Sequence, residues 1–188
     1  DHEQRRITHY FLQQFEVNAF PVLNKLPKYC IHNDANDYNL LVEKDHICGL
    51  IDFGDMVYSQ RVNNLAIACT YAMLGANDPL EIAAWVVKGY HSELQLSADE
   101  VSILYYLIAA RLCISVTNSA YQHSITSYNE HHFITEKPAW DLIFKWLRVS
   151  PVKAGQVFAE TCNILPEPDI EKKKTDLGLE RLQYIGRN

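Results

Sequence analysis

The stretch HNDANDYN at residues 32–39, followed by DFG at residues 52–54, decides how this sequence is interpreted. Asn and Asp favour turns and local side-chain bonds to the backbone, so residues 33–38 are predicted to form a loop. A short apolar run at residues 29–32 precedes this loop and is consistent with a buried strand. The polar loop is therefore expected to connect extended segments.

The residues between the two motifs are predicted to form a hairpin. Residues 39–42 and 46–51 are apolar enough for two short strands, and Lys44-Asp45 is the predicted turn between them. Such a hairpin would return Asp52 to the side of Asn39.

This arrangement matches the chemical needs of phosphoryl transfer. The reaction requires a carboxylate that orients the acceptor hydroxyl, and oxygen ligands that hold Mg²⁺ against the phosphates. Protein kinases meet these needs with H-R-D-x-x-x-x-N and D-F-G. Here His32-x-Asp34 is followed by Asn39 at the same spacing, so Asn39 and Asp52 are predicted to bind Mg²⁺ and Asp34 to face the hydroxyl. The alternative is a polar hairpin with an Asx-rich turn.

The rest of the chain is predicted to be helical, so the fold class is α+β, mainly α. Two to four short strands are available, too few for a large sheet. The expected helices are residues 3–20 (stopped by Pro21), 62–74, 79–94, a long helix from 98 to about 121, 138–147 and 151–164. Ser97 and Glu100 form a capping box before the long helix. Pro138 and Pro151 are expected in the first turns of their helices.

Composition excludes several classes of protein. The 188 residues are 48% apolar, and the net charge of −6 argues against a nucleic-acid partner. No apolar stretch is expected to reach the roughly 20 residues of a membrane span, because Arg111 follows the apolar residues 103–110, so no membrane partner is predicted. The five cysteines are scattered singly, which favours reduced core thiols and a cytoplasmic location.

The chain is predicted to divide at about residue 164. Residues 1–164 are interpreted as one lobe, and residues 165–188, which include Lys172-Lys173-Lys174, as a linker or tail towards a possible further domain. The sequence begins at Asp1 in what looks like the middle of a helix, so we expect a fragment of a longer protein.

The two motifs resemble the aminoglycoside phosphotransferase and choline kinase superfamily, whose usual form is H-G-D-x-x-x-x-N followed by I-D-x-G/D-D. Residues 51–56 and 110–121 are similar to hydroxylysine kinase-like enzymes. The resemblance implies a protein-kinase-like C-lobe, with Asp34 as catalytic base, Asn39 and Asp52 as Mg²⁺ ligands, and ATP or GTP as co-substrate. It also implies that His32 braces the loop. Asn33 replaces the family's Gly, and because Asn tolerates positive φ, the loop is expected to keep its shape.

Several other residues have two interpretations. Asp55 could cap the next helix or fix the Mg²⁺ loop, and a structural role is favoured. Arg111 could bind an anionic group of the substrate or pair with a carboxylate of the lobe. Asp37, Tyr121 and Glu130 could reach the substrate, although surface or core roles are favoured for each.

The functional hypothesis is a Mg²⁺-dependent kinase that phosphorylates the hydroxyl of a small amino alcohol or hydroxy amino acid. Hydroxylysine is favoured by resemblance, with homoserine, choline-like alcohols and aminoglycosides as alternatives. A regulatory pseudokinase lobe, or a lobe fused to a pyridoxal-phosphate aminotransferase, are the competing hypotheses. The sequence contains no Gly-rich phosphate loop, which would belong to a preceding N-lobe, so this fragment alone is expected to have negligible activity.

Overall fold

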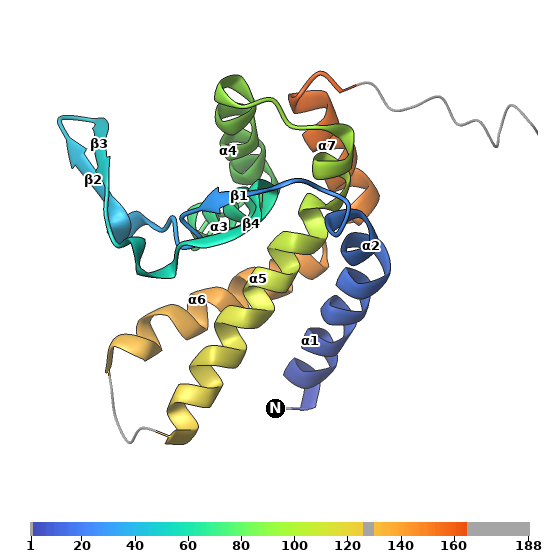
Figure 1. Ribbon diagram of the computed structural model, residues 1–188. Helices are drawn as coiled ribbons and strands as arrows, with labels where there is room; N and C mark the ends of the chain where they lie inside the picture. Colours follow the sequence, from blue (N-terminus) through green and yellow to red (C-terminus); the bar gives the residue numbers. More distant parts are fainter. Residues whose placement is uncertain (1, 126–129, 165–188) are drawn as a thin grey trace, which may run out of the picture.

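Helix α5 (Ala98–Ile125) lies at the centre of the computed structural model (Figure 1). The structure describes the backbone of residues 2–125 and 130–164 and the side chains of residues 2–121 and 137–164. In the described part of the chain, helices α1 (His2–Gln14), α3 (Arg61–Ala72), α6 (Glu130–Leu147) and α7 (Pro151–Thr161) pack against α5, as do the helical turns that follow α1. α4 (Pro79–Glu93) packs against α3 and α7. The largest fully buried side chains include Trp146, Phe11, Phe158, Leu65, Met73, Leu104 and Leu112.

The start of α5 confirms the predicted capping box. The Ser97 backbone N–H donates to Glu100 Oε2 at 2.8 Å, and the Glu100 N–H donates to Ser97 Oγ at 3.2 Å. These reciprocal bonds satisfy two backbone N–H groups that the first turn of a helix leaves unpaired. Local sequence chemistry therefore fixes where the central helix begins.

The first helical segment continues past its predicted stop. α1 is followed by a π-helical turn at Phe15–Ala19 and then by α2 (Phe20–Leu23). The prediction that Pro21 ends the helix was wrong, because Pro21 lies in the first turn of α2, where its missing N–H costs no hydrogen bond.

Pro138 also differs from prediction. It lies inside α6, which begins at Glu130, and does not start a helix. Helix propensity is a weak constraint that tertiary packing overrides, and the turns after Pro138 bury Ala139, Leu142, Ile143 and Trp146.

The strands form two separate antiparallel pairs, so the fold is α+β and mainly α. β1 (Lys28–Ile31) pairs with β4 (Val57–Gln60), and β4 is a strand that the sequence did not predict. β2 (Leu40–Glu43) pairs with β3 (His46–Leu50) through the predicted Lys44-Asp45 turn. Both turn residues have positive φ, 48° and 66°, as the two-residue turns favoured in hairpins require.

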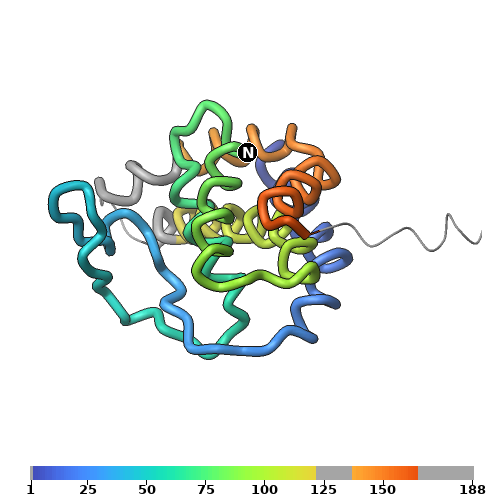
Figure 2. Tube along the Cα trace, turned by 90° about the horizontal axis from the view of Figure 1, so that it is seen from above, coloured from blue at the N-terminus to red at the C-terminus, as the bar shows by residue number. Residues whose placement is uncertain are grey.

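The strands lie to one side of the helices. In both views the β2–β3 hairpin extends away from the helical body (Figures 1 and 2). Its side chains are largely solvent-exposed, including Val42 and Ile47 at 64% and 66%.

Helix α5 is more apolar than the sequence analysis allowed. By length and composition its residues Ala98–Tyr121 could cross a membrane, contrary to the expectation that no segment approaches that length. However, 61% of the most apolar window is buried against the rest of the protein, and Arg111 within it pairs with Asp34. Its packing as the central helix accounts for its hydropathy.

Candidate active site

His32 connects the polar loop to the DFG segment. It follows β1 and is 7% exposed. Its Nδ1 accepts a long bond from the Asp34 N–H at 3.4 Å, which leaves Nε2 to donate to the Ile51 carbonyl at 2.9 Å. The ring also makes an edge contact with Phe53, with centroids 5.0 Å apart. The two motifs, separated in sequence, are thus joined through one buried ring.

Asn33 has the backbone conformation that its family counterpart, Gly, would adopt freely. Its φ is 66°, in the left-handed region, where Asn is tolerated better than most side chains. Its N–H donates to Asn64 Oδ1 at 2.9 Å, which ties the loop to α3. The loop therefore has a left-handed residue at this position despite the substitution.

The Asp34 carboxylate is held from both of its oxygens. Oδ2 accepts hydrogen bonds from Asn36 Nδ2 at 2.9 Å and Asn39 Nδ2 at 3.2 Å. Oδ1 accepts from the Tyr71 hydroxyl at 3.2 Å and lies 3.3 Å from Arg111 Nη2. The side chain is 21% exposed, so it is partly accessible as well as oriented. The donors on Oδ2 come from the loop, and those on Oδ1 come from α3 and α5.

Asn36 organises the turn that follows. Its Oδ1 accepts from the N–H groups of Tyr38 and Asn39, at 2.9 and 3.1 Å, at the start of a 3₁₀ turn over Asp37–Asn39. This side-chain cap replaces the hydrogen bonds that the turn lacks at its first residues. The same amide therefore shapes the loop and orients Asp34.

The hairpin brings Asp52 beside Asn39 along the backbone, as predicted. Leu40 pairs with Leu50, and the Ile51 N–H donates to the Asn39 carbonyl at 2.9 Å. Asp52 is exposed, with φ 60° and ψ 70°, and its Oδ1 accepts a weak bond from the Gly54 N–H at 3.4 Å.

The donor atoms of Asn39 and Asp52 fit a hard cation. Both side-chain bonds of Asn39 use Nδ2, to the Asp34 carbonyl and carboxylate, which leaves Oδ1 available as a ligand. Asp52 offers an exposed carboxylate. Within the described residues, no group of three His, Cys, Asp or Glu side chains is placed to hold a metal. Two oxygen donors suit Mg²⁺, which takes most of its remaining ligands from water and phosphates.

The other predicted residues are less closely connected. Asp55 is exposed, and the prediction that it caps the next helix was wrong, because α3 begins at Arg61 with Gln60 at its N-cap. Its role in the Mg²⁺ loop stays a prediction. Asp37 is exposed in the 3₁₀ turn, and Tyr121 is 61% exposed towards the end of α5. The Glu130 side chain lies outside the described residues.

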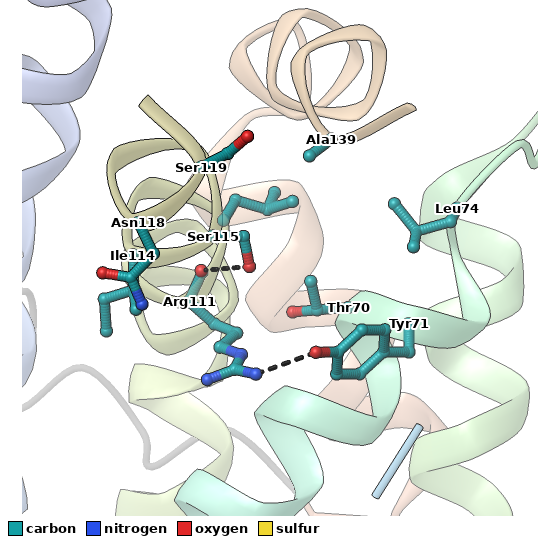
Figure 3. A pocket seen from close by; sticks show the side chains of 10 residues that line it. Thr70, Tyr71, Leu74, Arg111, Ile114, Ser115, Asn118, Ser119 and Ala139 are labelled. Atoms are coloured by element: carbon teal, nitrogen blue, oxygen red, sulfur yellow. Dashed lines mark hydrogen bonds between the residues drawn. The ribbon is translucent and has the colours of Figure 1, made fainter. Parts of the chain in front are cut away.

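Beside Asp34 is a pocket of about 310 Å³ between α3, α5 and α6 (Figure 3). Arg111 and Tyr71 line this pocket and also reach Asp34. The guanidinium carbon lies 5.5 Å from the centre of the Tyr71 ring, and Nη2 donates to the Tyr71 hydroxyl at 2.9 Å. The carboxylate that pairs with Arg111 is therefore the predicted catalytic base itself.

Sequence reasoning missed three contributors: Asn36, Asn64 and Tyr71. Asn36 lies inside the quoted loop, and its Asn-rich context was a usable signal for a capping side chain. Asn64 and Tyr71 lie in a predicted helix, where nothing in the pattern distinguishes them from surface or core residues.

A family of known proteins matches the part of the chain that carries both motifs. The model of the phosphotransferase enzyme family matches residues 4–100, just over half of the chain, and covers both motifs. The chain therefore belongs to this family of phosphotransferases.

Individual proteins that are similar to this chain include hydroxylysine kinases. The chain is 32% identical over 149 residues to a hydroxylysine kinase of Xenopus laevis, covering 73% of this chain and 40% of that protein. It is 26% identical over 167 residues to the Mus musculus hydroxylysine kinase, covering 84% and 44%, and 33% identical over 138 residues to that of Danio rerio, covering 69% and 38%. The matched part thus spans about two-fifths of these relatives. No solved structure matches the chain significantly.

Proposed function

We propose that this chain is the protein-kinase-like C-lobe of a nucleotide- and Mg²⁺-dependent kinase that phosphorylates the hydroxyl of a small hydroxylated amine or amino acid. Hydroxylysine is the first candidate acceptor, because the relatives reported above are hydroxylysine kinases. ATP and GTP are both candidate phosphoryl donors.

The observation that carries this proposal is the orientation of Asp34. Asn36 and Asn39 hold Oδ2, while Oδ1 is directed towards Tyr71 and Arg111 at the edge of a pocket. A general base needs a fixed position within hydrogen-bonding reach of the hydroxyl that it deprotonates. An Asx-rich turn with only a structural role would not require a carboxylate shared by four donors from three segments.

In the proposed reaction the acceptor hydroxyl lies against Asp34. The carboxylate accepts the hydroxyl proton as the oxygen bonds to the γ-phosphorus, and the bond to the β-phosphate oxygen breaks, releasing the nucleoside diphosphate. Asn39 and Asp52 would hold Mg²⁺, which neutralises charge on the phosphates. Catalysis depends chiefly on positioning, and the hydrogen bonds of Asp34 fix its side chain before substrate arrives.

A preceding lobe is proposed to complete the nucleotide site. Three large apolar side chains close to Asp52 in the sequence are exposed: Ile51, Phe53 and Met56, at 43%, 55% and 49%. Large apolar side chains left exposed beside a functional loop are available to pack against a partner. The chain of residues 1–188 alone is accordingly expected to turn over far more slowly than the full-length protein.

A phosphorylation assay of the full-length protein tests the proposal. Hydroxylated amines and amino acids would be screened with ATP and with GTP, and Asp34→Asn is expected to lower kcat by about 10²- to 10⁴-fold. Asp45→Asn is the control, because Asp45 is an exposed carboxylate in the hairpin turn and its positive φ is one that Asn tolerates. Full activity of Asp34→Asn would show that another group is the base.

A further inference from the structure

Arg111 has one donor whose role is unexplained. Its Nε is buried and has no hydrogen-bond partner among the described residues. Buried polar groups are nearly always paired, so each exception calls for an explanation, such as a ligand that the free protein lacks. The hydrogen bonds that the Arg111 side chain makes to described residues do not supply one, because they use Nη2.

The pairing of Arg111 with Asp34 is long for an ion pair. The distance from Nη2 to Oδ1 is 3.3 Å, whereas a strong charge-assisted N–H···O bond is about 2.7–2.9 Å. The shorter hydrogen bond of Arg111 Nη2, at 2.9 Å, is to the Tyr71 hydroxyl and not to the carboxylate. A substrate hydroxyl arriving at Oδ1 could replace the guanidinium there.

The pocket beside Arg111 carries one formal charge. Of the described side chains that line it, Arg111 is the charged one, and the others are apolar or neutral polar. A pocket with a cation and no carboxylate in its described lining favours an acceptor with an anionic group. Its volume of about 310 Å³ is in the range of small-molecule sites.

Two hydroxyl groups that line the pocket donate their protons to backbone carbonyls. Thr70 Oγ1 donates to the Ala66 carbonyl at 2.8 Å. Ser115 Oγ donates to the Arg111 carbonyl at 3.1 Å, the bond drawn in Figure 3. Each hydroxyl oxygen keeps lone pairs that can accept from a ligand N–H. The pocket therefore combines the Arg111 guanidinium, which can bind a carboxylate, with hydroxyl oxygens that can accept from an ammonium group on the same molecule.

We propose that Arg111 is the carboxylate-binding residue of the acceptor pocket, so that the acceptor is a hydroxylated α-amino acid and not a plain amino alcohol. This deepens the proposed function and rests on it. On binding, the acceptor hydroxyl takes the place of the guanidinium at Asp34 Oδ1, and the guanidinium turns to pair with the acceptor carboxylate. Arg111 thereby determines specificity, whereas Asp34 performs the proton transfer.

The test compares hydroxylysine with the hydroxylated diamine that remains when its carboxylate is removed, using full-length protein. Wild type is expected to prefer the amino acid, and Arg111→Gln to lower kcat/KM for the amino acid by about 10- to 100-fold more than it lowers kcat/KM for the diamine. Arg111→Lys keeps the charge but loses the fork, so it should restore only part of the preference. Arg148→Gln is the matched control, because Arg148 is exposed and does not line the pocket.

An equal loss of kcat for both acceptors in Arg111→Gln would overturn the inference, since it would mean that Arg111 only positions Asp34. Equilibrium binding of the two compounds without nucleotide separates this inference from the proposed function. If wild type binds the amino acid, Arg111→Gln does not, and no phosphoryl transfer occurs, the proposed function fails and the carboxylate site stands. Equal affinity of wild type and Arg111→Gln for the amino acid overturns the site. Melting temperatures of the variants check that each one folds.

Discussion

The Tyr71 hydroxyl lies between the two charged groups of the site. It accepts from Arg111 Nη2 at 2.9 Å and donates to Asp34 Oδ1 at 3.2 Å. Burial and the neighbouring Arg111, acting in opposite directions, give a raised pKa for this phenol. Tyr71 is therefore a neutral donor at physiological pH, and its effect on Asp34 is orientation.

Replacing this hydroxyl should slow the reaction modestly. One net hydrogen bond contributes about 1 kcal/mol, so Tyr71→Phe is expected to lower kcat about fivefold in the full-length protein. Steady-state kinetics measures this, and the pH profile of kcat should keep its shape because Asp34 remains the base. Tyr106→Phe is the control, as Tyr106 packs on Tyr105 away from the loop. A loss above 10²-fold would mean that Tyr71 itself takes part in proton transfer.

Asn33 offers a test of loop conformation. Because its φ is 66°, Asn33→Gly should preserve stability and activity, whereas Asn33→Val should destabilise by about 1–2 kcal/mol. The backbone N–H that donates to Asn64 is present in both variants, so the comparison isolates conformation. Urea denaturation measures the difference. Equal stability of the Gly and Val variants would contradict the left-handed assignment.

At the scale of elements, an ion pair connects the start of α3 to the start of α5. Arg61 Nε and Nη2 donate to the two Glu100 oxygens at 2.6 and 2.8 Å, and Nη2 also donates to the Gln95 carbonyl at 2.7 Å. Burial opposes ionisation of Glu100, but hydrogen bonds from Arg61 and Ser97 outweigh it, and the pKa of this carboxyl is lowered. The same residue therefore caps α5 and fixes it to α3.

The lowered pKa of Glu100 has a defined consequence for stability. A carboxyl whose pKa is lower in the folded state stabilises the protein above its unfolded pKa, and that contribution is lost as pH falls through the folded value. The stability advantage of wild type over Glu100→Gln should thus be full at neutral pH and shrink below the ordinary pKa of Glu. Near neutrality it is expected to be about 3 kcal/mol. Urea titrations between neutral and acidic pH measure it, and a constant difference would contradict the argument.

The elements that the sequence predicted correctly include several with strong local signals. The capping box at Ser97 depends on side chains within four residues of the backbone that they satisfy, and the Lys44-Asp45 turn depends on the conformation of two adjacent residues. β4 was missed because its pairing partner, β1, is distant in sequence and four residues carry little periodicity. Pro138 was misplaced because packing overrides local propensity.

In the candidate site, too, contacts within a short segment could be predicted and contacts between distant segments could not. The spacing of Asp34, Asn39 and Asp52 was visible because a short hairpin connects them. The pairing of Arg111 with Asp34 was left open, since no pattern specifies which of several carboxylates meets an arginine on another helix. Tyr71 could not be identified because its contact with Asp34 also depends on how α3 packs.

At the scale of the whole molecule, the cysteines distinguish the buried parts of the chain from the exposed parts. All five cysteines are free, but only Cys69, Cys113 and Cys162 are buried, so the expectation of five core thiols was wrong for Cys30 and Cys48. Cys30 lies in the small β1–β4 sheet, and Cys48 lies in the exposed hairpin. A sheet of two strands is too small to bury the side chains of its own residues.

Labelling of thiols at neutral pH should therefore distinguish two groups in the 188-residue chain. Cys30 and Cys48 are expected to react within minutes, and the other three only on unfolding, because burial raises the pKa of Cys113 to about 12 and also raises the pKa values of Cys69 and Cys162. Mass spectrometry after timed alkylation counts the modified sites. The urea-denatured chain provides the control with five. Rapid modification of Cys69 in the native chain would contradict the packing of α3.

The pairing of Asp34 with Arg111 spans 77 positions. Ribosomes add about 5–20 residues per second, so the loop is synthesised roughly 4–15 s before the arginine of α5. During that interval the loop can form its own Asn36 and Asn39 bonds, but Oδ1 of Asp34 has no cationic neighbour from α5. The polar end of the pocket is therefore assembled late, after the loop that it serves, and the order of synthesis separates the base from the residue that we propose selects its substrate.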